Sequence, residues 1–191
     1  MKRMVVGISG ATGVVYGVRL LEVLRGLGIE THLVLTRPAR LTIAYELERP
    51  VEEVLRLAHR VHPIHDVGSP LASGSFSCLG MVVAPCSMRT LAAIAHGLAD
   101  NLLTRAADVM LKERRRLVLL VRETPLSLVH IENMAAVTRA GAIVMPPLPA
   151  FYAKPRTIGE MVDHTVGRVL DLFGLPNDLA PRWRDPEDPL S

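Results

Sequence analysis

The fold of this chain is decided by residues 3–13, which read RMVVGISGATG. Residues 3–9 form an apolar run of strand length, and the glycine turn of residues 10–13 follows it directly. Beyond the turn, apolar side chains recur at helical spacing until Gly28, which predicts a helix over residues 14–27. A buried strand, a glycine turn and an amphipathic helix in this order are typical of the first unit of an α/β sheet.

The same alternation continues along the chain. We predict strands at residues 31–36, 80–84, 117–121 and 141–145, a long loop over 62–77, and helices at 38–48, 51–60, 105–113, 127–139 and 158–173, with a further helix beginning at Ser87. Continuous apolar strands separated by helices predict a parallel sheet covered on both faces. The expected fold class is therefore α/β, a single-domain doubly wound parallel sheet of the Rossmann-like or flavodoxin-like type. We place this domain at residues 1–174 and a tail or oligomer arm at 175–191.

Composition limits the classes of function. Hydrophobic residues make up 49% of the 191 residues and charged residues only 21%, so we expect a homo-oligomer. Two cysteines, Cys78 and Cys86, are too few for a disulfide framework and fit a reducing, cytoplasmic compartment. No apolar run approaches the ~18 residues that cross a bilayer, so we expect no membrane insertion. The basic run at 112–116 stands without a reader motif, and we expect no nucleic-acid partner.

Ligands of doubly wound sheets bind at the carboxyl ends of the strands. After the first strand, the glycines of residues 10–13 let the backbone approach a phosphate, and the following helix would point free N–H groups at it; a plain tight turn is the alternative. After the second strand stand Thr36 and Arg37, where a nicotinamide-binding chain usually has an acidic residue. This difference favours a mononucleotide over a dinucleotide.

Two later strand ends also carry candidate residues. Ser87 is a natural N-cap, and Thr90, three residues on, would face the same side and could reach a ligand. Arg122 and Glu123 leave a wholly apolar strand, where adjacent charges are costly to bury unpaired. That cost favours a functional role for Arg122 and Glu123.

Taken together, these segments resemble the UbiX-type flavin prenyltransferases, within the wider group of homo-oligomeric flavin-containing cysteine decarboxylases. The matching segments are spread in order over about residues 3–173: GISGATG (7–13), ASGSF (72–76), PCSMRT (85–90), RAAD (105–108) with LKERR (111–115), VRETP (121–125), MPP (145–147) and PAFY (149–152). The resemblance implies that reduced FMN accepts a prenyl group from dimethylallyl phosphate through its nitrogen 5 and carbon 6.

The resemblance also implies roles for individual residues. The flavin would be held by Gly10, Ala11, Thr12, Thr36, Ser87, Met88, Arg89, Thr90 and Arg122. The donor phosphate would be bound by Lys112, Tyr152 and Arg168, and the loop with Ser73 and Gly74 would close over the prenyl group. The implied catalytic residues are Glu123, Glu46, Arg122 and Lys112, the carboxyl groups moving protons and the cations stabilising the departing phosphate. No metal is implied.

Each of these positions has a plainer explanation. Lys112 suits a solvated helix face, Arg168 a surface ion pair with Asp171, Tyr152 simple packing, and Glu46 an exposed helix end. The chain also departs from the family pattern. The family more often has serine at the position of Thr12, and some members carry a tryptophan shortly before the loop, where this chain has no aromatic residue.

Three other functions remain open at this point. Residues 97–103 resemble a segment of the flavin-dependent decarboxylases of peptidyl cysteine, although the PASANT-like motif of those enzymes appears here as PCSMRT. The others are an aromatic-acid decarboxylase and a non-catalytic flavin carrier. For a prenyltransferase, the resemblance implies a dodecamer that supplies prenylated FMN to a UbiD-type decarboxylase, in quinone synthesis or in the breakdown of aromatic acids.

Overall fold

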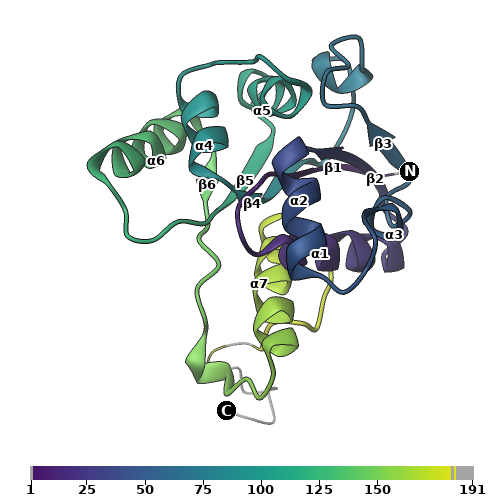
Figure 1. Ribbon diagram of the computed structural model, residues 1–191, viewed down its shortest axis with the longest axis vertical. Helices are drawn as coiled ribbons and strands as arrows, with labels where there is room; N and C mark the ends of the chain where they lie inside the picture. Colours follow the sequence, from purple (N-terminus) through teal and green to yellow (C-terminus); the bar gives the residue numbers. More distant parts are fainter. Residues whose placement is uncertain (1, 182, 184–191) are drawn as a thin grey trace. The chain divides into compact units, whose positions relative to one another are not determined.

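The centre of the fold is a six-stranded parallel sheet, seen in a computed structural model that describes residues 2–181 and 183 (Figure 1). The strands are β1 (Arg3–Ile8), β2 (Glu30–Leu35), β3 (Arg60–His62), β4 (Gly80–Cys86), β5 (Arg116–Val121) and β6 (Ile143–Val144). They pair in the order β3-β2-β1-β4-β5-β6, and every pairing is parallel. The order runs in opposite directions from β1 and from β4, so the switch point lies between these two strands. The expected Rossmann-like class is confirmed.

Seven helices connect the strands and follow them. They are α1 (Val14–Gly26), α2 (Arg37–Glu46), α3 (Val51–Leu55), α4 (Met88–Ala95), α5 (Leu102–Lys112), α6 (Leu128–Ala140) and α7 (Ile158–Leu172), with short 3₁₀ turns η1 (Pro70–Ala72) and η2 (Phe151–Ala153). Helices α1 and α5 lie on opposite faces of the sheet (Figure 1). Because both faces are covered, the inner strands bury nearly every side chain, and all seven residues of β4 are buried.

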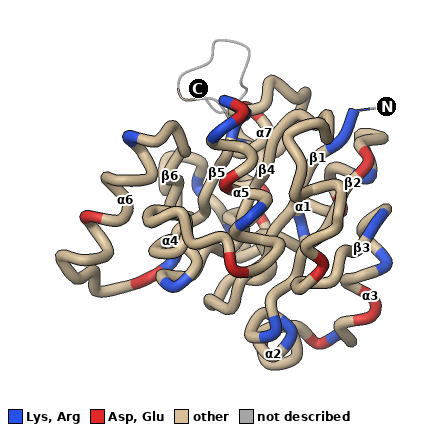
Figure 2. The backbone as a smooth tube through the Cα atoms, turned by 90° about the horizontal axis from the view of Figure 1, so that it is seen from above, with Lys and Arg blue, Asp and Glu red and all other residues tan. Residues whose placement is uncertain are grey.

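Helix starts are fixed by short polar side chains at the N-cap. The side chains of Thr36, Ser87, Asn101, Ser127 and Thr157 each accept a hydrogen bond from a backbone N–H in the first turn of their helix. Four strands begin with a charged residue, at Arg3, Glu30, Arg60 and Arg116, whereas the central strand β4 carries none (Figure 2). No helix in the described part of the chain is both long and apolar enough to span a bilayer.

The chain divides into two compact units, Met1–Pro146 and Pro147–Ser191. The first holds the sheet with helices α1 to α6, and the second holds η2 and α7. In the second unit, the segment after α7 lies against Gly167, where an added Cβ would come within 2.7 Å of the Asn177 side-chain oxygen. The boundary expected at residue 174 stays a prediction, and residues 182 and 184–191 of the expected tail lie outside the described residues.

One expected element is wrong. The helix predicted over residues 51–60 ends at Leu55, and residues 60–62, predicted at the junction of that helix with a loop, form the edge strand β3. In this strand Arg60 pairs with His32 and His62 with Val34 of β2. Strand β3 has only three residues, one of them charged, and therefore has no apolar pattern that would predict a strand. It is extended because it pairs with β2.

Candidate functional site

The candidate site begins at the switch point, where the ends of β1 and β4 are tied together by Ser9. The buried Ser9 hydroxyl donates to the Pro85 carbonyl at 2.8 Å and accepts from the Ser87 backbone N–H at 2.8 Å. Ser9 is not among the site residues predicted from the sequence. Its partners are 76 and 78 residues away, so only the strand order could have revealed the contact.

The glycine turn after β1 is packed against α2. A Cβ on Gly10 would overlap the ring of Pro38, so a glycine is required there. Gly13 has φ +93°, a conformation that glycine adopts easily. The backbone N–H groups of Gly13 and Val14 donate to Oε2 of Glu46 at 2.8 and 3.1 Å.

The N-terminus of α1 is therefore capped by a carboxylate from the end of α2. Glu46 is exposed at a helix end, as its plainer explanation predicted, yet its carboxylate has this definite position. The expectation that the first N–H groups of α1 are free for a phosphate is wrong for Gly13 and Val14. A carboxylate at this position is favoured because it satisfies N–H groups that the helix leaves unpaired.

The other two predicted flavin loops begin with N-capping side chains. Thr36 Oγ1 accepts from the Ala39 N–H at 3.2 Å, and the Thr36 N–H donates to the Ile8 carbonyl at 3.1 Å. Ser87 Oγ accepts from the Thr90 N–H at 3.4 Å and donates to the buried Thr90 hydroxyl at 3.2 Å. The N-cap role of Ser87 is confirmed. Both loops therefore have fixed conformations at the carboxyl edge of the sheet.

Of the remaining predicted flavin residues in these loops, Met88 is half-buried and Arg89 is exposed. The Arg89 guanidinium pairs with the Asp100 carboxylate at 2.6 Å. In the loop after β1, Ala11 is half-buried and Thr12 is exposed. Roles for these residues in binding a flavin stay predictions.

Arg122 and Glu123 lie at the end of β5, beside β4. The Arg122 N–H donates to the Cys86 carbonyl at 3.1 Å. The exposed Glu123 carboxylate accepts from the N–H of Thr124 at 3.0 Å. Within the described residues the Arg122 guanidinium has no hydrogen-bond or ion-pair partner, and it does not pair with Glu123. One cation and one carboxylate are thus presented side by side at the sheet edge.

The cysteine next to this pair is not a nucleophile. Burial raises the pKa of Cys86 to about 12, so its thiol stays protonated at neutral pH. Cys86 is a small core residue, as expected. The chemistry of the site therefore belongs to its charged and hydroxyl groups.

Lys112 lies beside the loop that carries Ser73 and Gly74. Its ammonium pairs with the Glu113 carboxylate, which holds the pKa of Glu113 below its usual range. A Cβ on Gly74 would overlap this carboxylate and lie 2.9 Å from Lys112 Nζ. The first unit therefore brings Lys112 and Gly74 together, while Lys112 itself stays exposed at the end of α5.

Tyr152 and Arg168 belong to the second unit. The Tyr152 hydroxyl lies 3.0 Å from His164 Nε2, and its ring meets those of His164 and Trp183 edge-on. The predicted surface ion pair of Arg168 is present, with 2.7 Å between its guanidinium and the Asp171 carboxylate. Both candidate phosphate ligands thus have a definite orientation within their unit.

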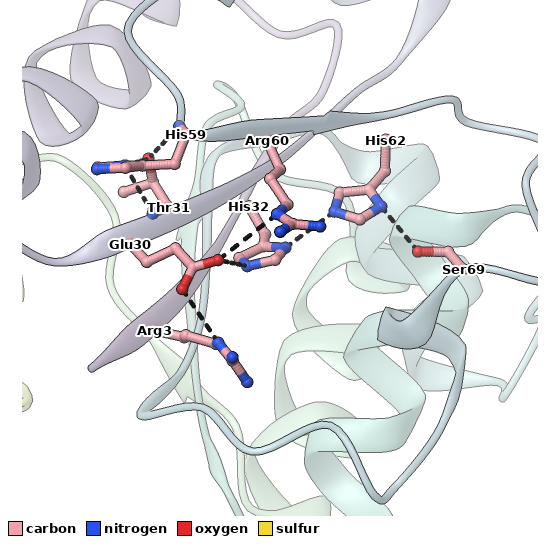
Figure 3. A network of polar contacts seen from close by, with 8 residues as sticks. All are labelled: Arg3, Glu30, Thr31, His32, His59, Arg60, His62 and Ser69. Carbon is pink, nitrogen blue, oxygen red and sulfur yellow. Dashed lines mark hydrogen bonds and ion pairs between the residues drawn. The ribbon is translucent and has the colours of Figure 1, made fainter. Parts of the chain in front are cut away.

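A chain of polar side chains connects β2, β3 and the following loop (Figure 3). Ser69 Oγ lies 2.8 Å from His62 Nδ1, His62 Nε2 lies 2.9 Å from His32 Nδ1, and His32 Nε2 lies 3.1 Å from the Glu30 carboxylate. Glu30 also pairs with Arg3 at 3.2 Å and with Arg60 at 3.6 Å. No pattern in the sequence predicts this network, which holds the first part of the loop over residues 62–77.

The protons in this network have one consistent order. Burial lowers the pKa of His32 and of His62, so both imidazoles are neutral at pH 7. If His32 donates to the Glu30 carboxylate, it must accept from His62, which in turn accepts from the Ser69 hydroxyl. In this order an extra proton on His32 Nδ1 would set its N–H against the N–H of His62 Nε2, whereas an extra proton on His62 Nδ1 would require the Ser69 hydroxyl to rotate and accept.

Known proteins of similar sequence and structure indicate the family of this chain. A family model described as Flavoprotein matches residues 1–170. A flavin prenyltransferase UbiX of Neisseria meningitidis is 53% identical over 98% of this chain and 100% of that protein. The crystal structure of AnUbiX (PadA1) in complex with FMN and dimethylallyl pyrophosphate has TM-score 0.94 and 53% identity, covering 96% of this chain and 98% of the other. That of a dodecameric FMN-dependent UbiX-like decarboxylase from Escherichia coli O157:H7 has TM-score 0.93 and 49% identity, covering 96% and 100%.

Proposed function

The chain belongs to the flavoprotein family and is a flavin prenyltransferase, and from this premise we propose that it transfers the dimethylallyl group of dimethylallyl phosphate to reduced FMN. The observation that carries the proposal is the adjacent Arg122 and Glu123 at the carboxyl end of β5. A cation with no protein partner in the described residues suits a phosphate, and a carboxylate beside it suits proton transfer.

The residues at the carboxyl edge of the sheet fit a flavin mononucleotide. A phosphate monoester calls for hydroxyl donors and a cation. Thr12 and Thr36 offer hydroxyl groups in the loops after β1 and β2, and Arg122 offers its guanidinium after β5. We propose that the flavin is held by Gly10, Ala11, Thr12, Thr36, Ser87, Met88, Arg89, Thr90 and Arg122.

The proposed chemistry needs a stabilised leaving group. When bound, reduced FMN supplies the nucleophilic ring atoms that take up the prenyl group. By resemblance to the family, the residues that we propose as donors to the departing phosphate are Lys112, Tyr152 and Arg168, together with Arg122. Donors that are oriented before the reaction lower the barrier because they meet the charge as it develops. The ion pairs of Lys112 and Arg168 provide such orientation.

Protons are moved by the two carboxyl groups, Glu123 and Glu46. Glu46 holds both N–H donors of the α1 cap on one oxygen, Oε2. Its Oε1 accepts no hydrogen bond from the described residues and can take a proton while the cap stays formed. Glu123 is oriented by the N–H of Thr124 and is open to a ligand.

The test is anaerobic incubation with reduced FMN and dimethylallyl phosphate, followed by mass spectrometry of the extracted flavin. We expect a flavin heavier by one five-carbon prenyl unit from the wild-type chain. We expect almost none from Arg122→Ala or Glu123→Gln, while Glu52→Gln, an exposed carboxylate in α3, reacts like the wild type. Unchanged FMN from wild-type protein that binds it well would refute the proposal and favour the decarboxylase or the carrier.

The proposal extends to partners and location. Leu128, Val129 and Ile131 of α6 are exposed apolar side chains suited to contacts between copies, and a similar protein is described as dodecameric. We propose a homo-oligomer of that size, to be tested by sedimentation velocity. We also propose that the protein is located in the cytoplasm, because its two cysteines are both free thiols. We further propose that a UbiD-type decarboxylase receives the prenylated flavin. The test is whether the product activates the cofactor-free form of that decarboxylase.

A further inference from the structure

The loop that carries Ser73 and Gly74 is held to the first unit by its backbone carbonyls. Arg105 Nε donates to the Ala72 carbonyl at 3.2 Å. The two terminal nitrogens of Arg115 donate to the Gly74 carbonyl at 2.6 Å and to the Phe76 carbonyl at 2.5 Å. A single guanidinium thus bridges both sides of the exposed Ser75, and its planar fork suits two acceptors at once.

Arg115 reaches the loop because of how α5 ends. Arg114 has φ +55°, which reverses the chain after the helix, and the Arg115 N–H then donates to the Met110 carbonyl at 2.8 Å. This turn directs Arg115 inward, so that it is half-buried while Arg114 and Arg116 are exposed. The Arg115 side chain is therefore directed towards the loop, to which it donates its hydrogen bonds, and away from the solvent.

The position that Arg115 fixes lies directly against Lys112. A Cβ on Gly74 would overlap the Glu113 carboxylate and approach Lys112 Nζ, so the loop backbone packs closely on this ion pair. The Gly74 carbonyl, which Arg115 binds, belongs to the same residue. Arg115 and the Lys112–Glu113 ion pair thus both contact Gly74.

We propose that Arg115 is a positioning residue that holds Ser73 and Gly74 against Lys112 and thereby sets the affinity for the phosphorylated prenyl donor. This inference rests on the proposed function, in which Lys112 binds the donor phosphate. Arg115 touches neither donor nor flavin in this role. Its loss acts on the Michaelis constant of the donor and leaves flavin binding unchanged.

The first measurement is hydrogen exchange of residues 72–77 in the flavin-free chain. The amides of Ser75 and Phe76 both donate within the loop, to Ser73, and report its opening. We expect faster exchange there in Arg115→Met, an intermediate rate in Arg115→Lys, and the wild-type rate in Arg114→Asn. Asparagine tolerates the left-handed conformation of that exposed neighbour, which makes the control conservative.

The second measurement is steady-state prenylation with dimethylallyl phosphate. Loss of two charge-assisted hydrogen bonds should raise the donor KM about 10- to 100-fold in Arg115→Met, with partial recovery in Arg115→Lys and no change in FMN affinity. If Arg115→Met fails to fold, Gly74→Ala tests the contact between the loop and Lys112, because the three atoms nearest to its Cβ belong to the flexible ends of Glu113 and Lys112. We expect it to raise the donor KM as well.

The outcomes separate this inference from the proposed function. A wild-type chain that leaves FMN unmodified overturns the proposed function and this role with it. A wild-type chain that prenylates FMN, with an unchanged donor KM in Arg115→Met or in Gly74→Ala, overturns this role alone. Faster loop exchange with an unchanged donor KM has the same meaning, because the loop would then be held without serving the donor.

Discussion

Gly17 is where α1 comes nearest to the sheet, and adding one methyl group there should destabilise the protein. A Cβ at this position would overlap the Ala84 carbonyl oxygen and lie 2.9 Å from two side-chain carbons of Ile8. The carbonyl belongs to the backbone of β4 and cannot rotate away. Gly17→Ala therefore forces the helix away from the end of β4, close to the Ser9 contact that joins β1 and β4.

Two opposing effects determine the size of the change. Alanine in place of glycine stabilises a helix by about 0.8–1 kcal/mol. Overpacking of a filled core costs about 1–3 kcal/mol, and contact with a fixed backbone atom belongs at or above the upper end. The net loss in free energy of unfolding should be about 2 kcal/mol. For a chain of this size that corresponds to a lower unfolding midpoint by about 4–8 °C.

Gly26→Ala in the same helix is the matched control. A Cβ at Gly26 meets nothing within 4 Å, so only the gain in helix propensity remains. Because Gly26 is the last residue of α1, we expect this variant to be unchanged or to gain up to about 0.5 kcal/mol. Thermal and urea unfolding of both variants and the wild type, at one protein concentration and without flavin, would measure the difference. An equal or higher midpoint for Gly17→Ala would refute the packing argument.

Three further predictions concern the capping and polar contacts. Glu46→Ala removes the carboxylate cap of α1. A cap contributes about 1 kcal/mol to the free energy of unfolding, so the unfolding midpoint should fall by about 2–4 °C. An unchanged midpoint would show that the cap contributes nothing. Ser9→Ala removes both hydrogen bonds of the buried Ser9 hydroxyl, which leaves the part-buried Ser87 N–H without its acceptor, and should cost about 1–3 kcal/mol in urea unfolding. A loss near zero would contradict this expectation. The pKa values of His32 and His62 are lowered from 6.5, so the unfolded chain binds protons first and stability should fall as the pH drops below about 6.5. Melting curves at pH 7.5 and about 5.5 should show this fall, and it should be smaller in His62→Gln.

The sequence predicted the apolar strands well because burial on both faces leaves a direct pattern. The runs at residues 3–9 and 117–121 correspond to β1 and β5 almost residue for residue. Helix α5 begins at Leu102, three residues before the predicted start, because the Asn101 side chain caps it. That capping signal was present in the sequence. Strand β3 had no such signal, since its partners are on β2.

The sequence predicted where in the fold the site residues lie, but it could not predict which residues contact one another. The rule that ligands gather at strand ends led to Thr36, Ser87 and Arg122. It could not show that Ser9 joins β1 to β4, or that Arg115 binds a loop about 40 residues away, because such contacts depend on tertiary packing. The Glu46 cap is a similar case, since α2 has to turn back beside α1 to form it.

Both borders of the sheet are narrow, with three residues in β3 at one side and two in β6 at the other. A border strand of this length leaves few backbone N–H and carbonyl groups for another chain to pair with. Copies of this protein therefore have little means of growing into a continuous sheet. Contacts between copies are therefore expected to come from side chains, and the rotation that relates two neighbouring copies decides whether the assembly closes.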